Sequence, residues 1–296
     1  MSYHEVSPLP ARILDGKALS EAILAKIAGE VADFKAQTGQ VPGLAAVLVG
    51  ENPASEVYVR NKQAACKSAG MFGRLDRLAS DASESTLLDL VDRLNADPQI
   101  HGILVQLPLP KQMDEQKIIE RIDPKKDVDG FHPENVGLLT IGRPRFVPCT
   151  PLGVQTMLLS AGISTTGTKA VVLGRSNIVG KPMALLLMQK GIGGDATVTV
   201  CHTATKDAPS IAREADILIA AVGKPEQVTA EWIKPGAVVI DVGIHRRDNG
   251  KLCGDVHFAS ASEVASWITP VPGGVGKMTI AMLLQNTMHA AKLAMS

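Results

Sequence analysis

Tyr58 and Lys62, a tyrosine and a lysine four residues apart, are the first pair in the chain that could do chemistry. They follow the apolar strand pattern 44–50, so the spacing predicts one shared helical face at the carboxyl end of a strand, where open α/β sheets bind ligands. The spacing alone favours a packed tyrosine beside a solvated lysine. However, the chain has only two tyrosines, and this scarcity favours a specific use for Tyr58.

Two further polar positions could hold a ligand. Gln106 ends the buried strand pattern 102–106, and its amide can donate and accept hydrogen bonds at once, which suits a heterocycle edge or a positioned water. A glutamine simply satisfied at a strand end is an equal alternative. Asp127 and Asp129 lie in a glycine turn, where a carboxylate can hold a paired N–H edge and the alternative is a solvated turn. We expect no metal here, because no third oxygen or histidine ligand stands at the spacing of a calcium loop.

The segment 169–180 predicts a nucleotide site. A β-branched strand pattern ends at Gly174, and a helix pattern begins near Gly180. Small residues let the backbone approach a pyrophosphate, and the N–H groups at the helix start face its charge. The spacing is Gly-x-Ser-x-x-x-Gly and departs from the usual Gly-x-Gly-x-x-Gly, so the motif alone is a moderate signal.

The residues after the next strand pattern, 196–200, indicate which dinucleotide is preferred. An NAD site usually has an acid there for the ribose hydroxyls. This chain instead offers groups that suit a 2′-phosphate, namely Arg175, His202, Thr203 and Lys206. NADP is therefore the predicted cofactor. NAD is the less favoured alternative, because Asp207 lies only a little beyond the expected position.

Composition excludes several function classes. The 30 basic and 30 acidic residues balance to zero net charge, so nothing favours nucleic acid or an anionic membrane as a partner. The four cysteines show no Cys-x-x-Cys spacing, which argues against a zinc site or a redox pair. Because the sequence shows neither a secretory pattern nor a membrane-spanning apolar run, we expect a cytoplasmic protein.

The elements that must position these residues alternate between helix and strand. The alternation predicts an α/β fold with mostly parallel strands and helices on both faces. Turn-forming sequence between 123 and 150 marks the domain boundary, giving a domain of 1–148 and a Rossmann-type NAD(P)-binding domain of 149–277. A last helix, 278–296, is expected to pack back on the first domain. The expected strands are 44–50, 72–78, 102–106, 169–174, 196–200, 216–221 and 237–241, and the main expected helices are 19–34, 52–70, 83–95 and 151–160.

The glycine-rich stretch 269–279 resembles a phosphate loop only superficially. A Walker motif requires glycine where Val271 stands and serine or threonine where Met278 stands. We interpret the stretch as a glycine loop that approaches a ligand just before the last helix.

Together these segments resemble the bifunctional methylenetetrahydrofolate dehydrogenase/methenyltetrahydrofolate cyclohydrolase family. The resemblance covers the chain from about residue 10 to its end, and five motifs in family order carry it. These motifs are 50–62, 105–110, 126–132, 174–182 and 270–276. Lys277 departs from the family, which often has proline there; this cation could aid the glutamate tail of folate or merely cap the helix.

The resemblance implies two reactions in one deep cleft between an N-terminal catalytic, folate-binding domain and the NAD(P)-binding domain. Oxidation of 5,10-methylenetetrahydrofolate with NADP would give the methenyl cation, and water would open that cation to 10-formyltetrahydrofolate. It further implies tetrahydrofolate one-carbon substrates, a homodimer, and a place in one-carbon metabolism and purine biosynthesis.

The resemblance also implies residue roles. Lys62 would be the central catalytic residue, tuned by hydrogen bonding to Gln106, while Tyr58 would stack on folate and Asp129 would grip the pterin N–H edge. Further folate contacts would come from Val105, Leu107, Pro272, Gly273, Gly274, Val275 and Gly276. The cofactor would contact Gly174, Arg175, Ser176, Thr203 and Ile244.

Two rival hypotheses remain open at this point. The chain could be an unrelated dehydrogenase that uses the same Rossmann turn on a small acid or a quinate-like substrate, and Gln106 and Asp129 would then be incidental. It could also be a nucleotide-sensing module without turnover. In that case Lys62→Met would change nothing beyond stability.

Overall fold

The structure, a computed structural model, describes residues 10–295. Contacts divide the described chain into two compact units. We name each by its main sheet: the six-stranded unit contains residues 10–19 and 150–278, and the three-stranded unit contains residues 20–149 and 279–295.

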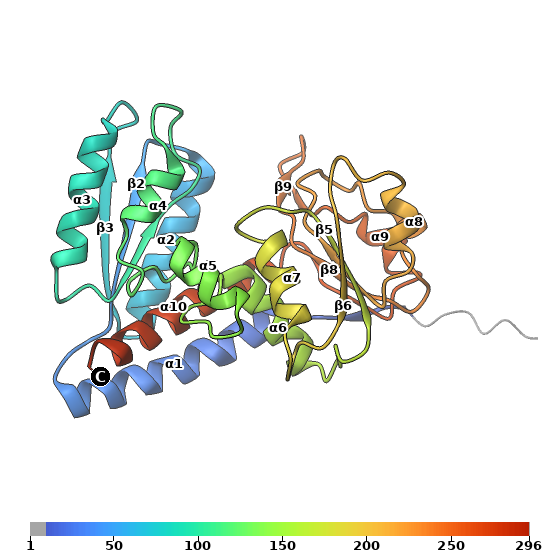
Figure 1. Cartoon of the computed structure of the whole chain (residues 1–296), viewed down its shortest axis with the longest axis horizontal. Helices are drawn as coiled ribbons and strands as arrows, with labels where there is room; N and C mark the ends of the chain where they lie inside the picture. The colour runs from blue at the N-terminus through green and yellow to red at the C-terminus, as the bar shows by residue number, and fades with distance from the viewer. Residues whose placement is uncertain (1–9, 296) are drawn as a thin grey trace, which may run out of the picture. The chain divides into compact units, whose positions relative to one another are not determined.

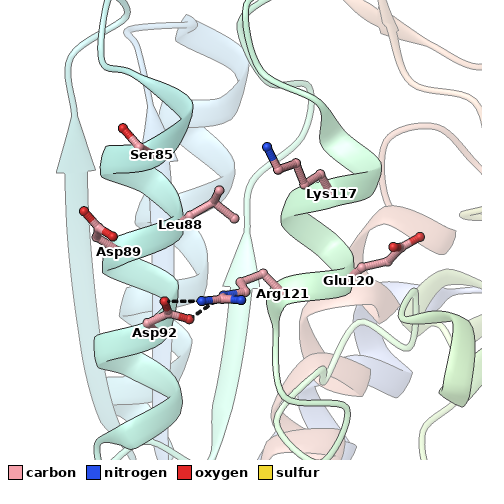
Figure 2. A pocket seen from close by; sticks show the side chains of 7 residues that line it. All are labelled: Ser85, Leu88, Asp89, Asp92, Lys117, Glu120 and Arg121. Atoms are coloured by element: carbon pink, nitrogen blue, oxygen red, sulfur yellow. Dashed lines mark hydrogen bonds and ion pairs between the residues drawn. The ribbon is translucent and has the colours of Figure 1, made fainter.

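The sheet of the three-stranded unit is entirely parallel and has β2 (Gly43–Val49) at its centre, between β3 (Phe72–Leu78) and β4 (Gly102–Val105). Every residue of β2 is buried, which explains why its sequence is a continuous apolar run. One face of the sheet packs on helices α3 (Glu84–Ala96) and α4 (Glu115–Arg121), which lie side by side (Figure 2).

The other face of this sheet is covered by α2 (Pro53–Ser68), the helix that carries the predicted Tyr58 and Lys62. Gly73 of β3 allows the close packing, because a Cβ there would lie 3.2 Å from the Cβ of Cys66 on α2. Helix α2 begins at Pro53, four residues after the end of β2 at Val49, so it starts at the carboxyl end of that strand, as the sequence predicts.

Two long helices complete the three-stranded unit. The later part of α1 (Gly16–Thr38) and most of α10 (Val275–Ala294) lie side by side in it (Figure 1). Lys292 on α10 donates to Glu30 on α1 at 2.7 Å. The short helix α5 (Pro133–Thr140) lies within 123–150, where the sequence predicted only turns. That prediction was incomplete, because two helical turns begun by His132-Pro133 show too little periodicity to be recognised.

The sheet of the six-stranded unit is also parallel throughout, in the order β1-β11-β8-β7-β5-β6. Strand β5 lies between β6 and β7, so the strand order reverses there, and such switch points bind ligands in open α/β sheets. The strands are β1 (Arg12–Ile13), β5 (Lys169–Leu173), β6 (Thr197–Cys201), β7 (Ile217–Ala220), β8 (Val238–Asp241) and β11 (Trp267–Ile268). The helices are α6 (Cys149–Ser160), α7 (Gly180–Met188), α8 (Ala208–Ala212), η1 (Ala230–Trp232) and α9 (Phe258–Ala261).

The predicted α/β class with parallel strands is confirmed, and the strand positions agree to within one or two residues. The sequence analysis missed β1, β11 and the antiparallel pair β9 (His245–Arg246) and β10 (Leu252–Cys253). Each has only two residues, which is too short to show an alternating pattern.

The pairing of β1 with β11 also groups residues 10–19 with the six-stranded unit. The predicted domain limits of 1–148 and 149–277 place the same residues in the other domain. Those limits, like the cleft, stay predictions.

Candidate active site

Lys62 is buried in the three-stranded unit, with an exposed fraction of 7%. Its Nζ donates to Oε1 of Gln106 at 3.0 Å, which joins helix α2 to the end of β4. Burial lowers the pKa of Lys62, and the nearby negative charge of Asp129 opposes that shift. The solvated lysine considered from the sequence is therefore excluded.

The amide of Gln106 has a defined orientation. Its Nε2 donates to the carbonyl of Leu107 at 2.8 Å, so Oε1 is the atom that faces Lys62. The backbone N–H of Gln106 still donates to Val47 in the sheet at 2.9 Å. Gln106 is thus held at both ends and in turn fixes the position of the amine.

Asp129 lies in the turn between α4 and α5 and shares the electrostatic environment of Lys62. Burial raises the pKa of Asp129 to about 6, while the positive charge of Lys62 opposes the rise. The carboxyl group is therefore mostly ionised at neutral pH and titrates just below it. Asp127, the other acid of the turn, is buried and accepts from the backbone N–H of His132 and from Asn135, so its role is to hold the turn.

Two residues beside Asp129 escaped the sequence analysis. The Cys149 thiol lies 3.7 Å from Oδ1 of Asp129, and burial raises the pKa of this thiol well above its usual value. Buried Asn286 on α10 donates to the carbonyls of Val128 at 2.8 Å and Val147 at 3.0 Å. Neither residue lies in a motif with chemical spacing, so no pattern in the sequence points to either.

The remaining predicted folate contacts of this unit lie around the same lysine. Tyr58 is one helical turn before Lys62 on α2 and is half-buried, which raises the pKa of its hydroxyl. Val105 is buried at the end of β4, and Leu107 follows Gln106 and precedes a cis peptide bond to Pro108. The structure therefore places all six predicted residues of the three-stranded unit at or beside the carboxyl ends of β2 and β4.

The six-stranded unit has a cavity of about 560 Å³ at the carboxyl ends of β5, β6 and β7. The turn after β5 contributes Gly174, Arg175 and Ser176 to its wall, and the residues after β6 contribute His202 and Thr203. Four of the five predicted cofactor contacts thus share one cavity at the strand-order switch. Ile244 does not line it.

Two glycines of the nucleotide turn allow backbone contacts that no side chain could replace. A Cβ on Gly174 would lie 2.2 Å from the carbonyl oxygen of Ala221, and one on Gly180 would lie 2.2 Å from that of Gly174. Ser176 closes the turn, because its Oγ accepts from the N–H groups of Val179 at 3.2 Å and Gly180 at 3.3 Å. The chain therefore builds a tight, small-residue turn at the start of α7.

The Asp207 side chain already makes a hydrogen bond within the fold. Asp207 lines the cavity but acts as the N-cap of α8, where its Oδ1 accepts from the N–H of Ser210 at 3.3 Å. The guanidinium of Arg175, the imidazole of His202 and the hydroxyl of Thr203 remain on the wall. This set of groups suits a phosphate better than a pair of ribose hydroxyls.

The segment from Pro272 to Gly276 belongs to the six-stranded unit. Pro272 is exposed, and the backbone of Gly274 lies so close to Gly16 that a Cβ on Gly16 would lie 2.2 Å from the carbonyl oxygen of Gly274. Helix α10 begins at Val275, so the predicted glycine loop ends at Gly274, earlier than expected. Contact of this segment with folate stays a prediction, as does the role of Ile244, whose side chain lies beside Gly276.

A second cavity, of about 410 Å³, lies between α3 and α4 (Figure 2). Arg121 and Asp92 form a two-bond ion pair across it, at 2.6 and 2.7 Å. Its lining shares no residue with the predicted site. Its charged groups are those of an exposed helix pair, so we do not assign it a ligand.

Residues 10–295 contain no group of three or more His, Cys, Asp or Glu side chains that could hold a metal ion. Within the same residues, no helix is both long and apolar enough to cross a membrane.

Comparison with known proteins gives one consistent result. The family model for the catalytic domain of tetrahydrofolate dehydrogenase/cyclohydrolase matches residues 14–129, and the model for the NAD(P)-binding domain of the same family matches residues 148–295. The chain is 58% identical over 284 residues to the bifunctional protein FolD of Bordetella avium, which covers 96% of this chain and 98% of that protein.

Solved structures agree. The bifunctional FolD enzyme of Campylobacter jejuni is 47% identical, with a TM-score of 0.92 over 96% of this chain and 99% of that one. The dehydrogenase-cyclohydrolase of Trypanosoma brucei, solved with NADP cofactor and an inhibitor, is 40% identical, with a TM-score of 0.92 over 97% of this chain and 99% of that one.

The nucleotide turn on a parallel sheet and the buried lysine cluster define the class, a nucleotide-binding α/β enzyme. Within that class, the chain belongs to the tetrahydrofolate dehydrogenase/cyclohydrolase family. The family inferred from the five sequence motifs is confirmed.

Proposed function

We propose that this chain oxidises 5,10-methylenetetrahydrofolate with NADP and hydrolyses the resulting methenyl cation to 10-formyltetrahydrofolate. Family membership supports both activities. The observation that carries the hydrolytic half is the buried Lys62, whose pKa is lowered and whose amine is held by Gln106.

The cavity of the six-stranded unit fits NADP. A side chain on Gly174 or Gly180 would clash with the backbone of the turn, and this tight turn leaves the N–H groups at the start of α7 to face a pyrophosphate. Arg175, His202 and Thr203 on the same wall would hold the 2′-phosphate. When bound, NADP supplies the hydride acceptor, and the chain's part is to hold and orient it.

Lys62 serves the proton transfers of the hydrolytic step. Because burial lowers its pKa, a larger fraction of the amine is neutral than in water. The neutral amine accepts a proton from the water that attacks the methenyl carbon, which gives a neutral carbinol. The carbinol then loses its hydroxyl proton as the C–N bond to one ring nitrogen breaks; that nitrogen keeps the electron pair and takes up a proton, and the formyl group stays on the other nitrogen. Gln106 keeps Nζ in one position during these transfers.

Asp129 and Tyr58 position the substrate. The ionised carboxylate of Asp129 accepts from the paired N–H groups of the pterin edge, a charge-assisted contact that also fixes the ring's orientation. The ring of Tyr58, one turn from Lys62, stacks on the folate. Further folate contacts are assigned to Val105, Leu107 and the segment 272–276.

We further propose a cytoplasmic homodimer whose 10-formyl product serves one-carbon metabolism and purine biosynthesis. These assignments rest on the family alone. Sedimentation equilibrium of the purified chain tests the dimer directly, since a single species at the monomer mass would contradict it.

A two-stage assay tests both activities. With 5,10-methylenetetrahydrofolate, we expect reduced nicotinamide to form faster with NADP than with NAD. With methenyl substrate alone, we expect hydrolysis faster than in buffer. Dehydrogenation without accelerated hydrolysis would reduce the chain to a dehydrogenase, and the absence of both signals would overturn the proposal.

A further inference from the structure

Asp255 has no place in the roles assigned above, yet it is completely buried, with an exposed fraction of 0%. A buried carboxylate is costly unless nearly all its acceptor capacity is used. Asp255 lies between β10 and α9, in the loop Gly254–His257 of the six-stranded unit. The groups that donate hydrogen bonds to Asp255 indicate its structural role.

Three successive backbone N–H groups donate to the Asp255 carboxylate. Val222 and Gly223 donate to Oδ2 at 2.6 and 3.0 Å, and Lys224 donates to Oδ1 at 3.1 Å. These residues form the loop that follows β7. One side chain thus fixes three consecutive peptide groups, which sets the path of the loop.

That loop is a wall of the cavity assigned to NADP. Val222 and Lys224 line the cavity together with Ala221, whose carbonyl oxygen is the close neighbour of Gly174. A shift of the loop would therefore move the surface that faces the nucleotide turn. Asp255 itself is not among the residues that line the cavity.

His245 on β9 completes the coordination, with its Nε2 at 2.7 Å from Oδ1 of Asp255. Its side chain is 21% exposed, whereas that of Asp255 is fully buried. A second buried acid, Asp241, holds the backbone of Asp255 by accepting its N–H at 2.9 Å. Gly243 leaves room for this arrangement, because a Cβ there would lie 2.3 Å from Oδ1 of Asp255.

We infer that Asp255, held by His245, is a positioning residue for the cofactor: it fixes the loop 222–224 as one wall of the NADP cavity. The inference rests on the proposed function, because it takes NADP as the occupant of that cavity. It predicts that loss of the Asp255–His245 contact weakens cofactor binding and spares the hydrolytic reaction, which uses no cofactor.

The first test is Asp255→Asn, which keeps the shape and replaces one acceptor oxygen by a donor. We expect the Kd for NADP, measured by calorimetry without folate, to rise about tenfold, the range for leaving a buried donor unpaired. Amide hydrogen exchange of 222–224 in the cofactor-free protein should accelerate, while hydrolysis of the methenyl substrate should keep its kcat and KM. A lowered Tm with unchanged Kd and unchanged exchange at 222–224 would overturn the inference and leave Asp255 a purely structural residue.

Substitutions of His245 carry the test if Asp255→Asn does not fold. His245→Leu removes the donor at a partly exposed position, and we expect the Kd for NADP to rise about threefold. His245→Gln retains an N–H donor and should restore most of the affinity. Equal affinity in all three proteins would overturn the inference.

Asp216→Asn is the matched control. Asp216 also accepts from a backbone N–H, that of Lys169 at 2.8 Å, but Lys169, unlike Val222 and Lys224, does not line the cavity. We expect its Kd for NADP to equal that of the unsubstituted chain, and an equal loss in this variant would count against a specific role for Asp255. Failure of the unsubstituted chain to bind NADP would instead overturn the proposed function.

Discussion

The folate-side cluster and the cofactor cavity are built by different means. In the three-stranded unit, the side chains of Lys62, Gln106, Asp129 and Cys149 act on one another, and burial shifts the pKa of each titratable member. In the six-stranded unit, the cavity depends on glycine positions and on backbone N–H groups.

The two regions differ because one must transfer protons and the other must fit a dinucleotide. A reaction that moves protons requires titratable groups with tuned pKa values, and burial provides the tuning. Binding a dinucleotide requires close backbone approach, and small residues provide it. Removing a side chain should therefore most affect hydrolysis at the folate-side cluster, whereas adding a single methyl group should most affect NADP binding in the cofactor cavity.

The largest effect is expected from Lys62→Met. Loss of a general acid–base group typically costs a factor of 10² to 10⁴, so we expect the hydrolytic kcat to fall by about 10³. The Kd for NADP should be unchanged, because Lys62 is not among the residues that line the cofactor cavity. Steady-state hydrolysis and calorimetry measure the two effects.

Lys67→Met, at an exposed position of the same helix, is the control. It makes the same chemical change outside the buried cluster and should leave hydrolysis unchanged. Equal hydrolytic rates in the two variants would show that burial of Lys62 serves packing alone, and the contrast between the regions would disappear.

The next effect is expected from Gly180→Ala. Its Cβ would lie 2.2 Å from the backbone oxygen of Gly174, so the turn must shift. We expect a loss of about 1–3 kcal/mol in the free energy of unfolding, the usual cost of overpacking, and a rise of at least about tenfold in the Kd for NADP, which corresponds to about 1.4 kcal/mol. Hydrolysis should persist in folded protein.

Gly29→Ala is the control for this prediction. Gly29 lies inside α1, and a Cβ there would meet nothing within 4 Å. Because alanine is the better helix former, we expect a small gain of about 0.5–1 kcal/mol. If Gly180→Ala bound NADP as tightly as Gly29→Ala, backbone approach would not be what shapes the cavity.

The sequence predicted the elements that carry this contrast because they are strongly patterned. Strand β2 is a continuous apolar run, and Gly174 and Gly180 stand at the junction of a strand pattern and a helix pattern. Position along the chain was enough to assign each to its unit. These are local patterns, and they can be recognised in the sequence without knowledge of the fold.

The contacts that tune the site could not be predicted in the same way. Lys62 and Gln106 are 44 residues apart, and Asn286 reaches across 158 residues to Val128. Whether a lysine is solvated or buried depends on such partners, which no periodicity reveals. The resemblance to a known family predicted the contact between Lys62 and Gln106. No feature of the sequence predicted the contacts of Asn286 or Asp255.

A moderate effect on cofactor choice is expected from Arg175→Ala. The guanidinium of Arg175 is a cation on the cavity wall assigned to the 2′-phosphate, and its planar donors suit a phosphate. Its loss should raise the KM for NADP about tenfold and leave the KM for NAD unchanged. An equal change for both cofactors in initial-rate assays would show that Arg175 contributes to the general shape of the cavity and carries no specificity.

The smallest effect is the pH dependence set by Asp129, whose pKa of about 6 places half of it in the neutral form at that pH. A protonated carboxyl accepts poorly from two N–H groups, so kcat/KM for the folate substrate should fall to about half its plateau near pH 6. Because the folded pKa is raised, the folded state binds the proton more tightly, and Asp129 lowers the free energy of unfolding as pH rises from about 4 to about 6. Asp129→Asn should flatten both profiles at a lower plateau of kcat/KM. If the acid limb near pH 6 persisted in that variant, another group of the Lys62 cluster would be the one that titrates.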